Sequence, residues 1–122
     1  MDADSGLCTP TTLTASPATV TGKFTPLTLR AKLSANSGPV AGAPLSFYVN
    51  VSSPTEKPRA GFLVGQATTG ADGTGAFVRP QGTDGLVLGD ERLASFEVQF
   101  APSTKIGGVQ YCQSKTDAAV SG

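Results

Sequence analysis

Residues Gln66 to Val78 read Gln-Ala-Thr-Thr-Gly-Ala-Asp-Gly-Thr-Gly-Ala-Phe-Val, and this stretch sets the pattern for the rest of the chain. Two short β-prone segments flank a turn at Ala71-Asp72-Gly73. Asp-Gly between such segments is a strong hairpin signal, because Gly adopts positive φ without steric cost and Asp tolerates the left-handed region. We therefore predict a β-hairpin in which a strand over Phe62–Thr69 pairs with a strand over Thr74–Arg79.

The clearest single strand lies at Leu27 to Ala35, where Leu and Ala alternate with Thr, Arg, Lys and Ser. A period of two over nine residues indicates one face toward a core and one toward water. A helix would place Arg30 and Lys32 within its apolar stripe, which excludes it. The same alternation predicts strands over Thr11–Ser16, Leu45–Val51, Leu93–Phe100 and Tyr111–Val120.

Turn-rich segments separate these strands, and no segment shows a helical period. They are Asn36–Pro44, Ser52–Gly61, Pro80–Arg92 and Ala101–Gln110. The apolar trio Leu86-Val87-Leu88 is expected to tuck under the core. Short strands at this spacing predict an all-β chain, a β-sandwich of about seven antiparallel strands in two sheets. The residues expected to be buried between the sheets are Leu29, Leu33, Phe47, Val49, Phe77, Phe96, Val98 and Phe100, with Ala94 facing the same way as Phe96.

Length and composition predict one small domain, because the 122 residues include 15 Gly and 9 Pro. We divide the chain into an N-terminal leader segment over residues 1–11, which contains Cys8, and one sandwich domain over residues 12–122. Nine basic residues balance nine acidic ones, which disfavours a nucleic-acid partner. No apolar run approaches the roughly 20 residues of a membrane span, so no membrane insertion is expected. Met1-Asp2-Ala3-Asp4 lacks signal-peptide features, so either a secretion leader has been removed or none existed.

The residues that most often perform catalysis or bind metals are scarce. The chain has no His, which removes the commonest general base and a common metal ligand. Its serines have no evident base partner and form no Ser-x-x-Lys motif, and its carboxylates are few and dispersed along the sequence. Asp72 and the glycines are explained by turns. We therefore predict no catalytic residue, no metal site, no cofactor and no enzymatic activity.

Six segments follow one another in an order that is moderately specific. They are Leu13–Pro17, Leu27–Leu33, Pro44–Val49, Val64–Thr69, Ala71–Phe77 and Ser95–Phe100. From about Thr12 to Val120 the chain resembles the bacterial immunoglobulin-like (Big-type) domains found as tandem repeats in surface and secreted proteins. The resemblance implies an immunoglobulin-like sandwich and a non-catalytic module of an extracellular or cell-surface protein, acting as a spacer, display or adhesion domain. Its partners would be a protein or glycan surface, or neighbouring immunoglobulin-like domains or subunits.

Immunoglobulin-like folds serve several functions, so two alternatives stay open. One is a virion or filament subunit, a decoration or assembly protein that pairs edge strands with a neighbour by β-augmentation. The other is a carbohydrate-binding accessory domain of an enzyme. The scarcity of aromatic residues disfavours the second, because only Tyr48 and Tyr111 would offer a stacking face.

The two cysteines, Cys8 and Cys112, suggest a covalent link. In a sandwich of this topology, the start of the first strand and the last connecting loop, Ala101–Gln110, lie at the same pole. Cys8 comes just before that strand and Cys112 just after that loop, so we predict that they form a disulfide. The alternative is two free thiols in a reducing cell. A disulfide favours maturation in an oxidising compartment or outside the cell.

Overall fold

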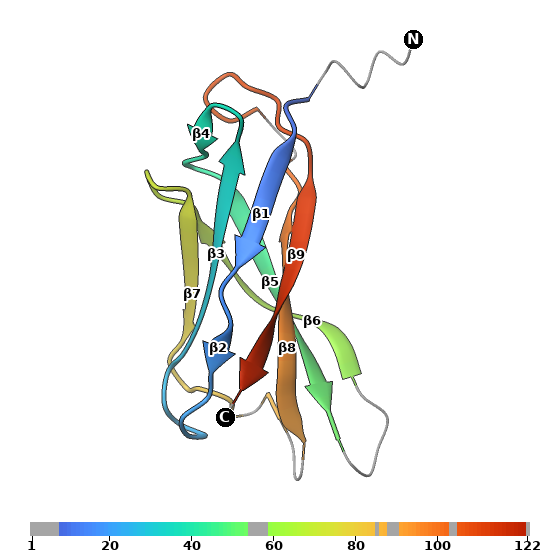
Figure 1. The fold of residues 1–122 in the computed structure, drawn as a ribbon. Helices are drawn as coiled ribbons and strands as arrows, with labels where there is room; N and C mark the ends of the chain where they lie inside the picture. Colours follow the sequence, from blue (N-terminus) through green and yellow to red (C-terminus); the bar gives the residue numbers. More distant parts are fainter. Residues whose placement is uncertain (1–7, 54–58, 85, 88–90, 103–104, 122) are drawn as a thin grey trace.

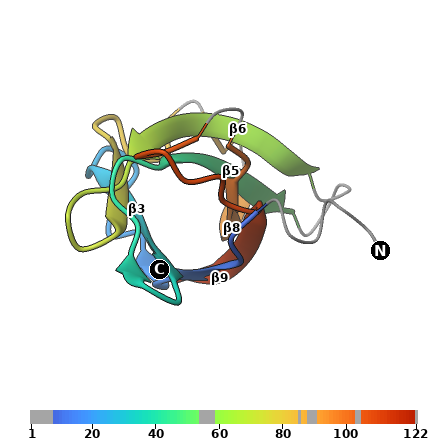
Figure 2. The ribbon, with the colours of Figure 1, turned by 90° about the horizontal axis from the view of Figure 1, so that it is seen from above.

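The computed structural model describes residues 8–53, 59–84, 86–87, 91–102 and 105–121. These residues form nine β-strands and no helix, and the strands lie in two sheets (Figure 1). The predicted all-β class and the two sheets are confirmed. Viewed along the strands, the sheets surround one interior space that the core side chains fill (Figure 2).

The first sheet is built around β3 (Leu27–Ala35), whose bounds match the prediction. β1 (Thr11–Ala15) pairs antiparallel along one side of β3. β7 (Thr74–Arg79) and the two-residue β4 (Gly38–Pro39) pair antiparallel along its other side. Along β3, Leu27, Leu29, Ala31 and Leu33 are buried, while Arg30 and Lys32 are exposed, as the alternation predicted.

The second sheet has the order β2-β9-β8-β5-β6. Its strands are β2 (Ala18–Thr19), β9 (Ser114–Ser121), β8 (Arg92–Phe100), β5 (Pro44–Ser52) and β6 (Arg59–Thr68). β2 pairs with β9 in parallel, and the remaining neighbours are antiparallel. The central strands β5 and β8 supply most of the buried aromatic residues.

The predicted hairpin between Phe62–Thr69 and Thr74–Arg79 is wrong, because β6 and β7 belong to different sheets. The turn itself is present: Gly73 has a φ of 80°, and the Thr74 N–H donates to Asp72 Oδ1 at 2.9 Å. Thr69, directly after β6, has a buried side chain at the point where the chain leaves the second sheet. Its hydroxyl donates to the Val40 carbonyl at 2.6 Å and accepts from the Ala43 N–H at 2.9 Å.

The predicted first strand, Thr11–Ser16, is divided between the two sheets. β1 ends at Ala15, and the Ser16 N–H makes the last bond to β3, donating to the Arg30 carbonyl at 3.2 Å. Pro17 has no N–H to donate, so pairing with β3 stops there. The chain then forms β2 beside β9 in the other sheet. The described residues therefore depart from seven antiparallel strands: seven strands have five or more residues, β2 and β4 are added, and one pair is parallel.

The core contains most of the residues predicted for it. Seven of the eight are buried, namely Leu29, Leu33, Phe47, Val49, Phe96, Val98 and Phe100. The eighth, Phe77, is only partly buried because it lies on the edge strand β7; its ring stacks on that of Phe47 with centroids 6.1 Å apart. Leu86 and Val87 pack against the core as expected, whereas Leu88 lies outside the described residues.

The predicted inward position of Ala94 is wrong. Ala94 is exposed, and its neighbour Leu93 is buried instead. Asn50 pairs with Ser95, but the next residue of β5, Val51, pairs with Leu93, so Ala94 is the extra residue of a β-bulge. A bulge of this kind reverses the inward and outward alternation on one side of it. Phe96, Val98 and Phe100 lie beyond it and keep the predicted register.

Candidate functional site

The predicted disulfide joins Cys8 to Cys112, with the two Cα atoms 4.9 Å apart and 104 residues apart in sequence. Cys8 precedes β1 and Cys112 precedes β9, the last strand. Neither cysteine is a free thiol, so that alternative does not hold for this structure. Both cysteines are partly exposed. The bridge therefore fastens the beginning of the fold to the beginning of its final strand.

Hydrogen bonds on both sides of the bridge hold the same two segments together. The Thr9 N–H donates to the Gln110 carbonyl at 2.7 Å, and the Cys112 N–H donates to the Thr9 carbonyl at 2.9 Å. The Thr11 hydroxyl lies 2.9 Å from both the Cys112 carbonyl oxygen and Ser114 Oγ. Residues 8–11, the last part of the predicted leader segment, are thus paired with the C-terminal segment; residues 1–7 lie outside the described residues.

Two carboxylates described above as dispersed are neighbours in the structure. Glu97 on β8 and Asp117 on β9 are directly opposite each other in the antiparallel register. They lie on the outer side of the sheet, where Gln99 Nε2 donates to Glu97 Oε2 at 2.6 Å. The sequence indicates only that each carboxylate lies at an outward position of its strand. The alternation within a strand does not predict its register with a strand that is distant in the chain.

The described residues hold no group of three or more His, Cys, Asp or Glu side chains placed to share a metal ion. Asp72 has the turn role predicted for it. The hydrogen bond from the Thr74 backbone N–H lowers the pKa of its exposed carboxyl group, and the positive charge of Lys32 acts in the same direction.

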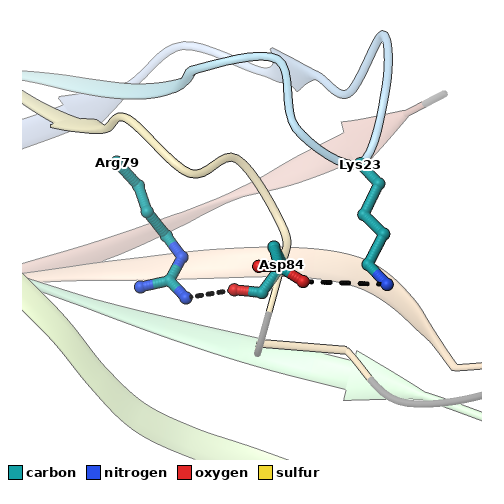
Figure 3. A network of polar contacts seen from close by, with 3 residues as sticks. All are labelled: Lys23, Arg79 and Asp84. Atoms are coloured by element: carbon teal, nitrogen blue, oxygen red, sulfur yellow. Dashed lines mark hydrogen bonds and ion pairs between the residues drawn. The ribbon is translucent and has the colours of Figure 1, made fainter.

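A polar network joins two connections at the pole opposite the disulfide (Figure 3). The Arg79 guanidinium donates through Nη2 to the backbone carbonyl of Asp84 at 2.7 Å. The Asp84 carboxylate lies 3.7 Å from Lys23 Nζ, and both side chains are about half exposed. Gly82 lies against the β2–β3 loop, where a Cβ would overlap the backbone carbonyl oxygens of Lys23 and Thr25. The network holds the β2–β3 loop against the segment after β7, which is a structural role.

The described part of the molecule has surface hollows. One of about 340 Å³ lies beside the start of β8 and the end of β9, and it is lined by apolar residues such as Val20 and Val120 together with Glu91 and Arg92. The two tyrosines considered for sugar stacking lie apart, since Tyr48 is in the middle of β5 and Tyr111 is beside the disulfide. Tyr111 packs edge-on against Phe100 at 6.5 Å between ring centroids. No helix among the described residues has the length and apolarity needed to cross a membrane.

Comparison with known proteins finds a likeness of fold. No family model and no curated protein matches the sequence. Among solved structures, the crystal structure of MtrC from Shewanella baltica OS185 superposes with a TM-score of 0.57 at 13% sequence identity. The match covers 89% of this chain and 21% of that one, so this chain spans about a fifth of the length of the protein it resembles. At this identity the likeness shows the fold alone.

Proposed function

We propose that the chain is a non-catalytic, bacterial immunoglobulin-like (Big-type) module of an extracellular or cell-surface protein, acting as a spacer, display or adhesion domain. The observation that carries the proposal is the Cys8–Cys112 disulfide. Disulfides form and persist in oxidising environments such as the bacterial periplasm and the cell exterior. The proposal of no catalysis rests on the sequence, which contains no His and no nucleophile with an evident base.

The sheet order supports the immunoglobulin-like assignment. In the immunoglobulin constant fold, strands A, B and E share one sheet and strands C, F and G share the other. β1, β3 and β7 likewise share one sheet, and β5, β8 and β9 share the other, so we match them with A, B and E and with C, F and G. β6 lies beside β5, where variable-type domains add a further strand to the same sheet.

The positions of the two described ends support a spacer. β1 begins at the pole that carries the disulfide, and β9 ends at the opposite pole (Figure 1). A module whose ends lie at opposite poles adds its full length to a protein when joined to others in series. Neighbouring immunoglobulin-like domains or subunits are therefore the partners that this geometry fits best, with a protein or glycan surface as the target of an adhesive protein.

One observation favours a virion or filament subunit as the second candidate. β6 forms an edge of its sheet over ten residues and exposes Leu63, which is 55% accessible. An edge strand offers unpaired backbone groups to a strand of another subunit. The register shifts between β5 and β6 disfavour long regular pairing there, which is why the module remains our first candidate.

The test is to find the protein in intact source cells and read the oxidation state of its cysteines in the same sample. Antibody binding to unbroken cells, with Cys8 and Cys112 resistant to alkylation until a reductant is added, is the expected result. A protein confined to the cytoplasm with two alkylated thiols would overturn the proposal. Co-purification with phage or filament particles would instead support the second candidate.

A further inference from the structure

The disulfide divides the chain into a closed part and two ends. Residues 9–111 lie within the covalent ring closed by Cys8 and Cys112. Only the residues before Cys8 and the segment from Gln113 onward lie outside it, and this second segment contains all of β9. β9 runs from the pole with the disulfide to the opposite pole, so it spans most of the length of the described fold (Figure 1).

Tension applied between the two chain ends follows the shortest covalent path. Between Cys8 and Cys112 that path is the disulfide, which spans 4.9 Å from Cα to Cα, whereas the main-chain path takes 104 residues. The ring residues therefore carry no load while the bridge is intact. They include the strands β1 to β8 and the whole buried core.

The loaded segment after Cys112 is already close to its full length. A strand rises about 3.4 Å per residue, and a fully extended chain reaches at most about 3.6 Å. The nine residues from Gln113 to Ser121 can therefore lengthen by only about 2 Å. β9 is also held along its length by pairing with β8, from Ser114 opposite Phe100 to Ala119 opposite Ser95.

We infer that the module resists extension under tension, and that reduction of Cys8–Cys112 makes it extensible. This inference rests on the proposed spacer function, because only a protein loaded at both ends would use it. While the bridge is intact, the load passes from Cys8 through the two sulfur atoms into β9. After reduction, the same load passes through the folded strands, which separate and release the ring residues.

The reductant that this switch needs is a small dithiol. One of its thiolates attacks a Sγ atom of the bridge, forming a mixed disulfide and releasing the other cysteine as a thiolate. The second thiol of the reductant then attacks the mixed disulfide, giving a cyclic disulfide and a second protein thiolate, so two electrons pass from the dithiol to the protein. Both cysteines are partly exposed and so within reach of a small reagent. Without load, the Thr9–Gln110 and Cys112–Thr9 hydrogen bonds keep the two thiols adjacent, which favours reoxidation.

The experiment is single-molecule stretching of the purified protein between handles fused before Met1 and after Gly122. The oxidised protein is expected to show no unfolding step. With a small dithiol present, one molecule is expected to release a contour length of about 350 Å, because the 104 residues between the cysteines become part of the loaded path. A release of that size from the oxidised protein, or none from the reduced protein at forces that unfold unbridged β-sandwiches, would overturn the inference.

A change of attachment point provides the matched control. A handle at Ser37, an exposed residue of the turn before β4, places part of the ring under load. Pulling between Ser37 and the C-terminus should then release about 100 Å from the oxidised protein, since the shortest path runs back through 29 residues to Cys8 and across the bridge. The reduced protein should release about 260 Å in this geometry, because the path then follows 75 residues to Cys112. Equal releases in the two redox states would contradict the assigned load path.

Two variants distinguish the effect of the disulfide from that of the hydrogen bonds beside it. Thr11→Val removes the hydroxyl contacts to Cys112 and Ser114 and keeps the bridge, so it should resist extension as the wild type does. The double variant Cys8→Ser/Cys112→Ser should extend without any reductant; if it does not fold, the dithiol measurement on the wild type still decides the question. These measurements do not depend on where the protein resides. Their failure would therefore not contradict the proposed surface location. Conversely, a cytoplasmic location would not contradict the mechanical result.

Discussion

Gly65 on β6 lies directly against the aromatic ring of Phe77 on β7, so that a Cβ at Gly65 would overlap three ring carbons. The contact joins edge strands of the two sheets, and the same Phe77 ring stacks on Phe47 opposite Gly65. The absence of a side chain at Gly65 is therefore what allows Phe77 to close this side of the core.

We expect Gly65→Ala to lower the free energy of unfolding by about 1–3 kcal/mol, as overpacking of a close-packed site does. The φ of Gly65 is not positive, so the effect is steric. Urea denaturation measures it, and Gly70→Ala is the control, because the nearest atoms to a Cβ there are 4.0 Å away. A cost at Gly70 equal to that at Gly65 would show that backbone freedom, rather than the ring, is responsible.

Phe96→Ala should lower the free energy of unfolding by about 3–5 kcal/mol, because large-to-small changes in a tight core lose transfer free energy and leave a cavity. Phe96 is fully buried, and its ring lies 6.5 Å from that of Phe47 between centroids. The control is Phe24→Ala, at a side chain 69% exposed, which should change stability by less than about 0.5 kcal/mol. Chemical denaturation of both variants tests the register of β8. If Phe96→Ala lost less stability than Phe24→Ala, the register of β8 would be off by one residue.

The oxidised protein should contain no titratable thiol before or after denaturation, and full reduction should expose two. Loss of the bridge is expected to lower the free energy of unfolding by about 4–5 kcal/mol, since it closes a ring of about 100 residues in the chain-entropy treatment. Urea denaturation of the oxidised protein and of Cys8→Ser/Cys112→Ser measures the difference. Two reactive thiols in protein purified without reductant would contradict the bridge.

Asp72 should titrate below its usual value of 3.8, because its carboxylate accepts the Thr74 N–H in the folded state. A carboxyl group whose pKa is lowered by folding stabilises the fold at pH values above its unfolded-state pKa, and that contribution is lost as the pH falls through the folded-state pKa. NMR titration of the Asp72 side chain gives the pKa directly. The difference in the free energy of unfolding between the wild type and Asp72→Ala should decrease as the pH falls below the usual pKa of the carboxyl group. A difference that does not change with pH would contradict the role of the charge.

Much of the fold could be predicted because it depends on local rules. The bounds of β3 and β7 match the predicted strands, and those of β1, β5, β6 and β8 differ by no more than about three residues. β9 begins at Ser114 rather than at Tyr111, since Tyr111 makes only an isolated bridge with Thr9. The disulfide was also predictable, because only two cysteines exist and the resemblance placed both at one pole.

The errors concern contacts between distant residues. The bulge at Ala94 is specified by the pairing of β8 with β5, and the meeting of Glu97 and Asp117 is specified by the pairing of β8 with β9. In the same way, the hydrogen bonds of the Thr69 side chain to Val40 and Ala43 join residues that are 29 and 26 positions apart in the sequence. The alternation of apolar and polar residues within a single strand predicts none of these contacts.

The positions of the strands, the inward residues of most strands and the turn at Asp72-Gly73 can be predicted from the order of the amino acids alone. These properties follow from side-chain alternation and from the backbone freedom of Gly, both of which act over a few residues. The three-dimensional structure was needed to see which strands are neighbours, that the chain changes sheets at Pro17, and how the disulfide lies relative to β9. Every non-proline residue offers the same backbone N–H and C=O groups, so the packing of the whole core selects the partner of each strand.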